Sequence, residues 1–185
     1  MAIRKVARLG HPVLRAKCRD VTREEITTPE IKRLVRDMVE TMHEYGGVGL
    51  AAPQVHESVR LAVIQYDNDN ERYEGQAEQP LLVLFNARVK VLDPTPAGFW
   101  EGCLSVPGLR GYVERPSKIE VNFLDERGKP KTMLAEGFLA TVFQHELDHL
   151  DGVLYVDKIV DKTKLAFNEE FSRYHLEDGD EPPPE

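Results

Sequence analysis

The chain has 185 residues, of which 24 are Lys or Arg and 32 are Asp or Glu, so its formal net charge is −8. This length suits one domain with its own hydrophobic core, and 41% hydrophobic with 30% charged residues is typical of a globular protein. The acidic balance argues against a dedicated nucleic-acid surface, and no apolar run approaches the ~20 residues of a membrane span. With two cysteines and no apolar block near its first residue, the chain is expected to be cytoplasmic, with reduced thiols.

The first clear element in chain order is a helix that begins at Pro29. Thr28 is suited to cap this helix, and proline is favoured at the first helical position. Apolar residues then recur at helical spacing as far as Met42, and Gly46-Gly47 predicts the end of the helix.

Branched apolar residues dominate the middle of the chain and predict β-structure. Strands are expected over residues 59–66, 81–92, 111–113, 118–124 and 131–135, with the second of these broken near Asn86. Pro94 and Pro96 predict a turn, and residues 125–128 predict the turn of a hairpin. The polar stretch 67–80 predicts a surface loop.

Two more helices are predicted, over residues 136–151 and 162–174, and Gly152 closes the first of them. Residues 177–185 contain five acidic residues and three prolines, and we expect this acidic tail to be disordered. Helices interspersed with short strands favour an α+β fold. The prediction is a single domain of residues 1–176, with short, mostly antiparallel strands around a central helix.

The helix predicted over 136–151 contains the sequence His145-Glu146-Leu147-Asp148-His149, which matches the pattern HExxH. Residues four apart on a helix share one face and are ~6 Å apart along the axis, so both imidazoles can reach one cation. Glu146 lies beside that face, where a carboxylate can accept a proton from a water on the metal. The pattern predicts that the central helix carries a metal site.

A catalytic metal site normally has a third protein ligand and one open position, and the sequence offers two kinds of candidate. A zinc peptidase would use a glutamate about twenty residues downstream, here Glu169 or Glu170. Cys103 would instead contribute a thiolate, which binds divalent cations strongly. The residues alone leave both alternatives open.

Three segments in fixed order resemble the motifs of the peptide deformylase family. They are Gly47-Val48-Gly49-Leu50-Ala51-Ala52-Pro53-Gln54, Glu101-Gly102-Cys103-Leu104-Ser105 and His145-Glu146-Leu147-Asp148-His149. The similarity runs from roughly residue 3 to residue 160. The resemblance implies an enzyme that removes the N-formyl group from formyl-methionine at the start of newly made polypeptides and releases formate.

By the same resemblance, Cys103, His145 and His149 would hold one divalent metal, with water as the fourth ligand. Fe²⁺ is the ion expected in vivo, with Zn²⁺, Ni²⁺ or Co²⁺ as alternatives. Glu146 is implied as the base that takes a proton from the water and passes it to the leaving amine.

The resemblance also implies donors to the developing oxyanion and a place for the peptide. The Gln54 side chain and the Leu104 backbone N–H would stabilise the oxyanion. The backbone contacts and the pocket for the methionine side chain would come from a second set of residues, in which Arg110 would contact the substrate or steady the Cys103 loop. That set is Gly47, Val48, Gly49, Val142 and Arg110.

Asp148 and Arg115 are predicted to form an ion pair that orients the metal-site helix. The expected partners are the formyl-methionyl peptides of nascent chains, and contact with the ribosome follows only from the family's role. No membrane partner and no dedicated nucleic-acid surface are expected.

Two further alternatives stay open from the sequence. A metal-stabilised binding module could recognise formylated or acetylated N-termini without turnover, although Glu146 and Gln54 argue against a pure binder because it needs no base. A disulfide between Cys18 and Cys103 would remove the thiolate from the predicted metal site.

Overall fold

The computed structural model describes residues 2–66 and 78–176. These residues form one six-stranded sheet in which β1, β2, β3, β4 and β5 follow one another and β6 pairs with β4, every pairing being antiparallel. The strands are β1 (Gly49–Ala51), β2 (Leu61–Tyr66), β3 (Gln79–Cys103), β4 (Val106–Leu124), β5 (Pro130–Glu136) and β6 (Leu165–Phe167). The α-helices are α1 (Arg23–Ile26), α2 (Pro29–Glu44), α3 (Gly137–His149), α4 (Tyr155–Lys158) and α5 (Asn168–Tyr174), and short 3-10 helices cover Pro12–Arg15, Ala52–Val55 and Lys162–Lys164. The fold is a single domain of mixed helices and antiparallel sheet, as predicted.

Helix α2 confirms the prediction made from its capping residues. The hydroxyl oxygen of Thr28 accepts a hydrogen bond from the backbone N–H of Ile31 at 3.4 Å, and Pro29 is the first helical residue. The helix ends at Glu44, and Gly46 then adopts a positive φ of 62°, a conformation that glycine reaches without strain.

Strands β3 and β4 are much longer than the sequence predicted. Pro94 and Pro96 lie inside β3, so the predicted turn there is wrong, and the two strands expected over 111–113 and 118–124 are parts of the single strand β4. The ladder between β3 and β4 shifts register at Asn86, near Asp93 and before Pro96. These irregularities accommodate the left-handed backbone conformation of Asn86 and the two prolines without ending the strand.

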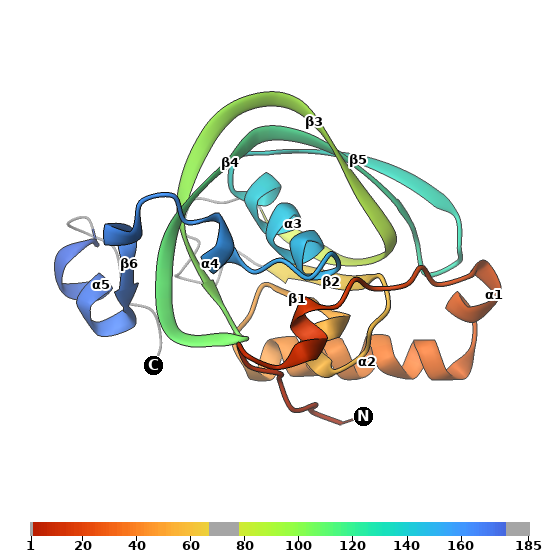
Figure 1. The fold of residues 1–185 in the computed structure, drawn as a ribbon. Coiled ribbons are helices and arrows are strands. Elements are labelled where there is room, and N and C mark those ends of the chain that lie inside the picture. The colour runs from red at the N-terminus through yellow and green to blue at the C-terminus, as the bar shows by residue number, and fades with distance from the viewer. Residues whose placement is uncertain (1, 67–77, 177–185) are drawn as a thin grey trace.

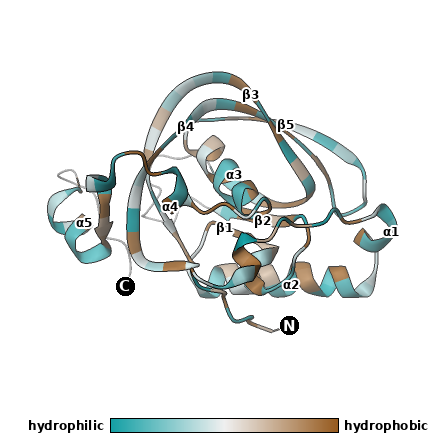
Figure 2. Cartoon of the chain, in the orientation of Figure 1, coloured by the Kyte–Doolittle hydropathy of each residue, from teal (hydrophilic) through white to brown (hydrophobic). Residues whose placement is uncertain are grey.

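The sheet separates two apolar layers that hold α2 and α3. Figure 1 shows β3, β4 and β5 arching over α3, while α2 runs below β1 and β2. Side chains of β2 alternate between the two layers: Ala62 and Ile64 pack with Phe143 of α3, and Leu61 packs with Met38 of α2. Brown and teal alternate along α2 in Figure 2, as expected of a helix with one apolar face.

The C-terminal part differs from the helix predicted over residues 162–174. Only Asn168–Tyr174 is α-helical, because Lys162–Lys164 forms a 3-10 turn and Leu165–Phe167 forms β6. β6 pairs with residues 109–111 of β4, so a strand partner from elsewhere in the chain overrides the helical pattern.

Two predictions concern residues outside the described part of the chain. They are the surface loop, of which residues 67–77 are not described, and the acidic tail at 177–185. Within the described ranges, none of the helices combines the length and the apolar character needed to cross a membrane.

Candidate metal centre

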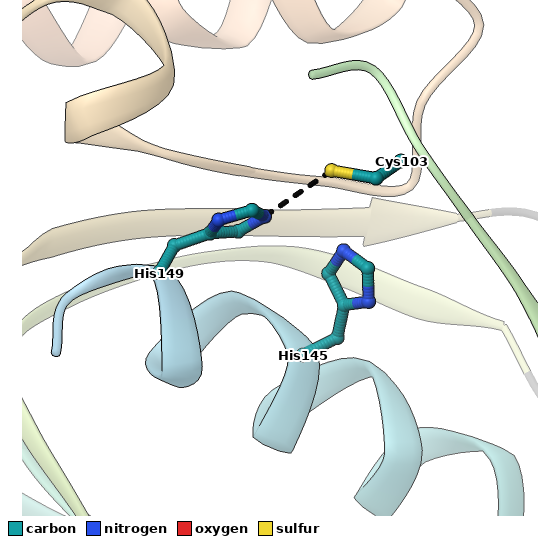
Figure 3. A group of neighbouring side chains, drawn as sticks. All are labelled: Cys103, His145 and His149. Carbon is teal, nitrogen blue, oxygen red and sulfur yellow. Dashed lines mark hydrogen bonds between the residues drawn. The ribbon is translucent and has the colours of Figure 1, made fainter. Parts of the chain in front are cut away.

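Three donor atoms from two distant parts of the chain converge at one point. Cys103 is the last residue of β3, while His145 and His149 lie in the last two turns of α3. The sulfur of Cys103 lies 3.3 Å from Nε2 of His149, and one donor atom from each of the three residues lies within 4.8 Å of the other two. In Figure 3 both imidazoles project from α3 toward the cysteine. The three residues predicted as ligands are therefore neighbours in the structure.

This donor set fits a divalent transition metal. Ligand atoms around one tetrahedral ion lie roughly 3.3–3.8 Å apart, and the 3.3 Å between the Cys103 sulfur and Nε2 of His149 falls in this range. One thiolate and two imidazoles are ligands that iron, zinc, nickel and cobalt accept. Beside them, Oε2 of Glu146 is buried without a hydrogen-bond partner among the described residues, so a carboxylate oxygen is available to a water at the metal.

A buried carboxylate orients His145. Nδ1 of His145 lies 2.7 Å from Oε2 of Glu101. An ionised carboxylate only accepts, so Nδ1 donates and Nε2 faces the donor group with its lone pair. Arg115 donates to both oxygens of Glu101, at 2.6 and 3.0 Å, and its third nitrogen donates to Asp148 at 2.7 Å. The predicted ion pair between Asp148 and Arg115 is confirmed.

The role of Glu101 was not predicted from the sequence, although Glu101 lies two residues before Cys103. The signal was available, because a metal-bound histidine usually donates its second nitrogen to a carboxylate or carbonyl. Burial raises the pKa of Glu101, but hydrogen bonds from His145 and Arg115 outweigh it and leave the pKa below its usual value.

Glu146 occupies a tight and largely dry position beside the histidines. Its side chain is 5% exposed, and burial raises its pKa to about 7. Gly49 of β1 lies against it, since a Cβ atom at Gly49 would lie only 2.5 Å from Oε1 of Glu146. A carboxylate with this pKa can accept and release a proton near neutral pH.

Gln54 and the turn between β3 and β4 surround the Cys103 sulfur. Oε1 of Gln54 accepts a hydrogen bond from the backbone N–H of Ala51 at 2.8 Å. This bond fixes the amide so that Nε2 points to the sulfur of Cys103, at 3.5 Å, and to the Ser105 hydroxyl, at 3.3 Å. Leu104 follows Cys103 directly in the turn. Both residues predicted to stabilise the oxyanion therefore lie beside the donor group.

Gly47 and Val48 lead into β1, which is the edge strand of the sheet. The carbonyl of Val48 accepts from the N–H of Gln65 in β2 at 2.9 Å, so the N–H and C=O of Gly49, the next residue, point away from β2. Gly47 lies against the Leu104 side chain, because a Cβ atom added at Gly47 would lie only 3.1 Å from Cδ1 of Leu104. Val48 packs in the same apolar cluster as Val142.

Arg110 is a buried residue of β4, 8% exposed. It is the register partner of Gly102 and lies over it, since a Cβ atom at Gly102 would meet the Arg110 Cζ atom at 3.7 Å. Its guanidinium is therefore packed next to the residue that precedes Cys103.

Two alternatives left open by the sequence do not match the structure. Glu169 and Glu170 lie in the first turn of α5, where Glu170 pairs with Arg173 at 3.6 Å, and neither belongs to the donor group found in the described part of the chain. Cys18 and Cys103 are both free thiols, so the alternative of a disulfide between them is wrong.

The sequence matches known proteins along most of its length. The pattern that defines the polypeptide deformylase family covers residues 3–165. A peptide deformylase from Leptospira biflexa is 48% identical over 170 residues, which cover 92% of this chain and 95% of the relative. A peptide deformylase from a Picosynechococcus species is 44% identical over 158 residues, covering 85% of this chain and 80% of the relative.

Solved structures agree with these sequence relatives. A class I type b peptide deformylase from Acinetobacter baumannii, bound to Met-Ala-Ser, superposes with a TM-score of 0.81 at 34% identity, covering 85% of this chain and 99% of that chain. A peptide deformylase from Synechococcus elongatus in complex with actinonin gives a TM-score of 0.76 at 36% identity, covering 93% of this chain and 86% of that chain. With its own Cys-His-His donor group and the family pattern spanning nearly the whole domain, the chain belongs to the peptide deformylase family, hydrolases that remove the N-formyl group from newly made polypeptides.

Proposed function

We propose that this chain hydrolyses the formyl group of formyl-methionyl peptides at a metal held by Cys103, His145 and His149. The observation that carries the proposal is the convergence of these three donors beside a buried carboxylate, Glu146. When bound, a divalent metal lowers the pKa of a coordinated water and polarises the carbonyl that is attacked. In this proposal α3 is the central helix of the fold, because it packs against β1, β2, β3, β4 and β5 and supplies both histidines.

Glu146 is the proton carrier of the proposed reaction. Its Oε2 atom, buried and free to accept a proton, takes one from the attacking water as the oxygen bonds to the formyl carbon. The same carboxyl group then gives the proton to the amine nitrogen, the C–N bond breaks, and formate and the free N-terminus are released.

The negative charge that develops on the formyl oxygen needs donors already in place. We assign this role to Nε2 of Gln54, which lies 3.5 Å from the Cys103 sulfur, and to the backbone N–H of Leu104, the residue that follows Cys103. The hydrogen bond from Ala51 to the Gln54 side chain keeps the amide from turning its oxygen toward the site. Donors held in this way need no reorganisation during the reaction.

The peptide is proposed to bind as a strand along the outer edge of β1. The N–H and C=O of Gly49 point away from β2 and are available to an added strand, and Gly47 and Val48 continue the same edge. Val48 and Val142 provide apolar surface for the methionine side chain. Arg110, a guanidinium with donors only, is assigned to the carbonyl groups of the bound peptide.

The cellular part of the proposal follows from the substrate. Formylated N-termini emerge from the ribosome in the cytoplasm, and the two free thiols suit a reducing compartment. We take residues 1–176 as the catalytic domain and residues 177–185 as an acidic tail without a catalytic role. Fe²⁺ is proposed as the native ion, with Zn²⁺, Ni²⁺ and Co²⁺ able to occupy the same sulfur and nitrogen donors.

Formate release from formyl-Met-Ala-Ser, measured without oxygen and together with metal analysis of the same sample, tests the proposal. Oxygen must be absent because it oxidises both Fe²⁺ and the Cys103 thiolate. We expect formate release with about one metal ion per chain, and iron in protein purified anaerobically from its natural source. Metal-loaded protein that releases no formate would contradict the proposed function.

Two variants separate the alternatives. Cys103→Ser should lose metal and activity, whereas Cys18→Ser, which removes the other thiol, should keep both. A Cys103→Ser protein that retains metal and cleaves internal peptide bonds would support a peptidase instead. Glu146→Gln should keep metal and bind product peptide while losing nearly all turnover. An unchanged rate in this variant would contradict the role of Glu146.

A further inference from the structure

The C-terminal helix α5 packs on the same stretch of β4 that carries Arg110. Strand β6 leads into α5 and pairs with Leu109, Arg110 and Gly111. Phe171, the buried residue of α5, is 6% exposed, and its ring centroid lies 5.3 Å from Cζ of Arg110. The Arg110 side chain therefore has Gly102 next to it on its own sheet and an aromatic face beside it from the last helix.

Trp100 gives the Phe171 ring a fixed support. The Trp100 ring lies 5.0 Å from the Phe171 ring and 5.9 Å from the ring of Tyr112, its register partner across β3 and β4. His175, at the end of α5, packs on Trp100 at 4.8 Å. An aromatic group anchored on both strands thus holds α5 at a set distance from the Cys103 turn.

We propose that Phe171 is a positioning residue for substrate binding, whose ring holds the Arg110 guanidinium beside the turn that carries Cys103. The inference rests on the proposed function, in which Arg110 contacts the bound peptide. A guanidinium over an aromatic face is attracted by the ring and loses much of its rotational freedom. The last helix then contributes to peptide binding although it carries neither a metal ligand nor the base.

The test is steady-state kinetics with formyl-Met-Ala-Ser on metal-loaded Phe171→Ala and Phe171→Leu proteins. Both variants remove the ring, but leucine keeps apolar bulk, so it reports on the ring even where the alanine protein folds poorly. We expect KM to rise roughly three- to tenfold, the range for loss of a partly buried cation–π contact, with kcat changed less than twofold. Phe171→Tyr, which keeps the aromatic face, should restore the wild-type KM.

Three controls make the result decisive. Tyr174→Ala changes a 72% exposed aromatic residue on the same helix and should leave KM unchanged. In an Arg110→Ala background, Phe171→Leu should add no further increase in KM, because the residue that it positions is gone. Trp100 is the only tryptophan of the chain and contacts both Phe171 and His175, so a shift of its emission maximum to that of the urea-unfolded protein would show that α5 has left the sheet.

The inference is overturned if Phe171→Leu leaves KM at the wild-type value, or if it raises KM equally with and without Arg110. It is also overturned if Phe171→Tyr fails to restore KM. A wild-type protein that releases no formate would instead refute the proposed function, so the two failures are distinguishable.

Discussion

Gly49→Ala should disable the base while leaving the metal site intact. Gly49 does not have a positive φ, so alanine is compatible with its backbone, and the effect comes from the added methyl group alone. That group would lie 2.5 Å from Oε1 and 2.7 Å from Cδ of Glu146. Non-bonded contacts prefer about 3.5–4.0 Å, so the carboxylate must retreat by about 1 Å.

A displacement of this size lowers kcat by about 10²-fold, because the proton acceptor no longer reaches the attacking water. The three atoms nearest to the added methyl group all belong to Glu146, so metal content should stay at the wild-type level. The assay is anaerobic formate release at saturating formyl-Met-Ala-Ser, with metal analysis of the same protein. Gly102→Ala is the matched control, since a Cβ atom there meets nothing closer than 3.7 Å, and this variant should keep its kcat within about threefold.

A wild-type kcat in Gly49→Ala would refute this reasoning, because the reaction would then tolerate a displaced Glu146 carboxylate. It is also refuted if the variant loses its metal, because Gly49 would then support the ligands. The added methyl group of Gly49→Ala overpacks the site and should lower the free energy of unfolding by about 1–3 kcal/mol. Urea titration of Gly49→Ala beside Gly102→Ala measures this difference.

Three further predictions concern the surroundings of the site. Glu101→Gln should weaken metal binding by about 10–100-fold in competition with a chelator, because His145 loses its anionic partner, and an unchanged affinity would contradict this link. Tyr155→Phe should lower the free energy of unfolding by about 1 kcal/mol in urea, because the tyrosine hydroxyl donates to a β4 carbonyl at 3.1 Å, and equal stability would show that the bond contributes nothing. Arg15 holds the pKa of Asp157 below its usual value, so the ion pair stabilises above about pH 4 and the stabilisation disappears as pH falls through the pKa of the folded state. Because both side chains are more than a third exposed, Arg15→Gln should cost under about 1 kcal/mol at pH 7 in metal-free protein. This cost should shrink as the pH falls below about 4, and a cost that stays constant would argue against an ionic origin.

Local signals in the sequence were sufficient for the elements that depend on neighbouring residues. Thr28 and Pro29 define the start of α2 because capping involves residues three apart, and the HExxH pattern lies in α3 because its periodicity is local. The hairpin turn before β5 was predicted for the same reason. Each of these elements could be predicted from the residues within or next to it.

Long-range pairing explains most of what sequence reasoning missed. Pro94 and Pro96 favour turns in isolation, but β4 pairs with β3 on both sides of them and keeps the strand extended. Residues 165–167 continue a helical pattern, yet the open edge of β4 makes them a strand. The choice of Cys103 over Glu169 or Glu170 as the third ligand depended on family resemblance, because no spacing rule links a cysteine to histidines in a helix that begins more than thirty residues later.

The position of Cys103 at the closed end of the β3–β4 ribbon has a consequence for biosynthesis. His149 follows Cys103 by 46 residues, which a ribosome adds in roughly 2–9 s. A hairpin closes within microseconds once both of its strands are available, so the sulfur can be presented on a formed turn before the helix that supplies both imidazoles has folded. During that interval the nascent enzyme carries an unprotected thiol, and an oxidant that reaches it first would yield a folded chain unable to mature.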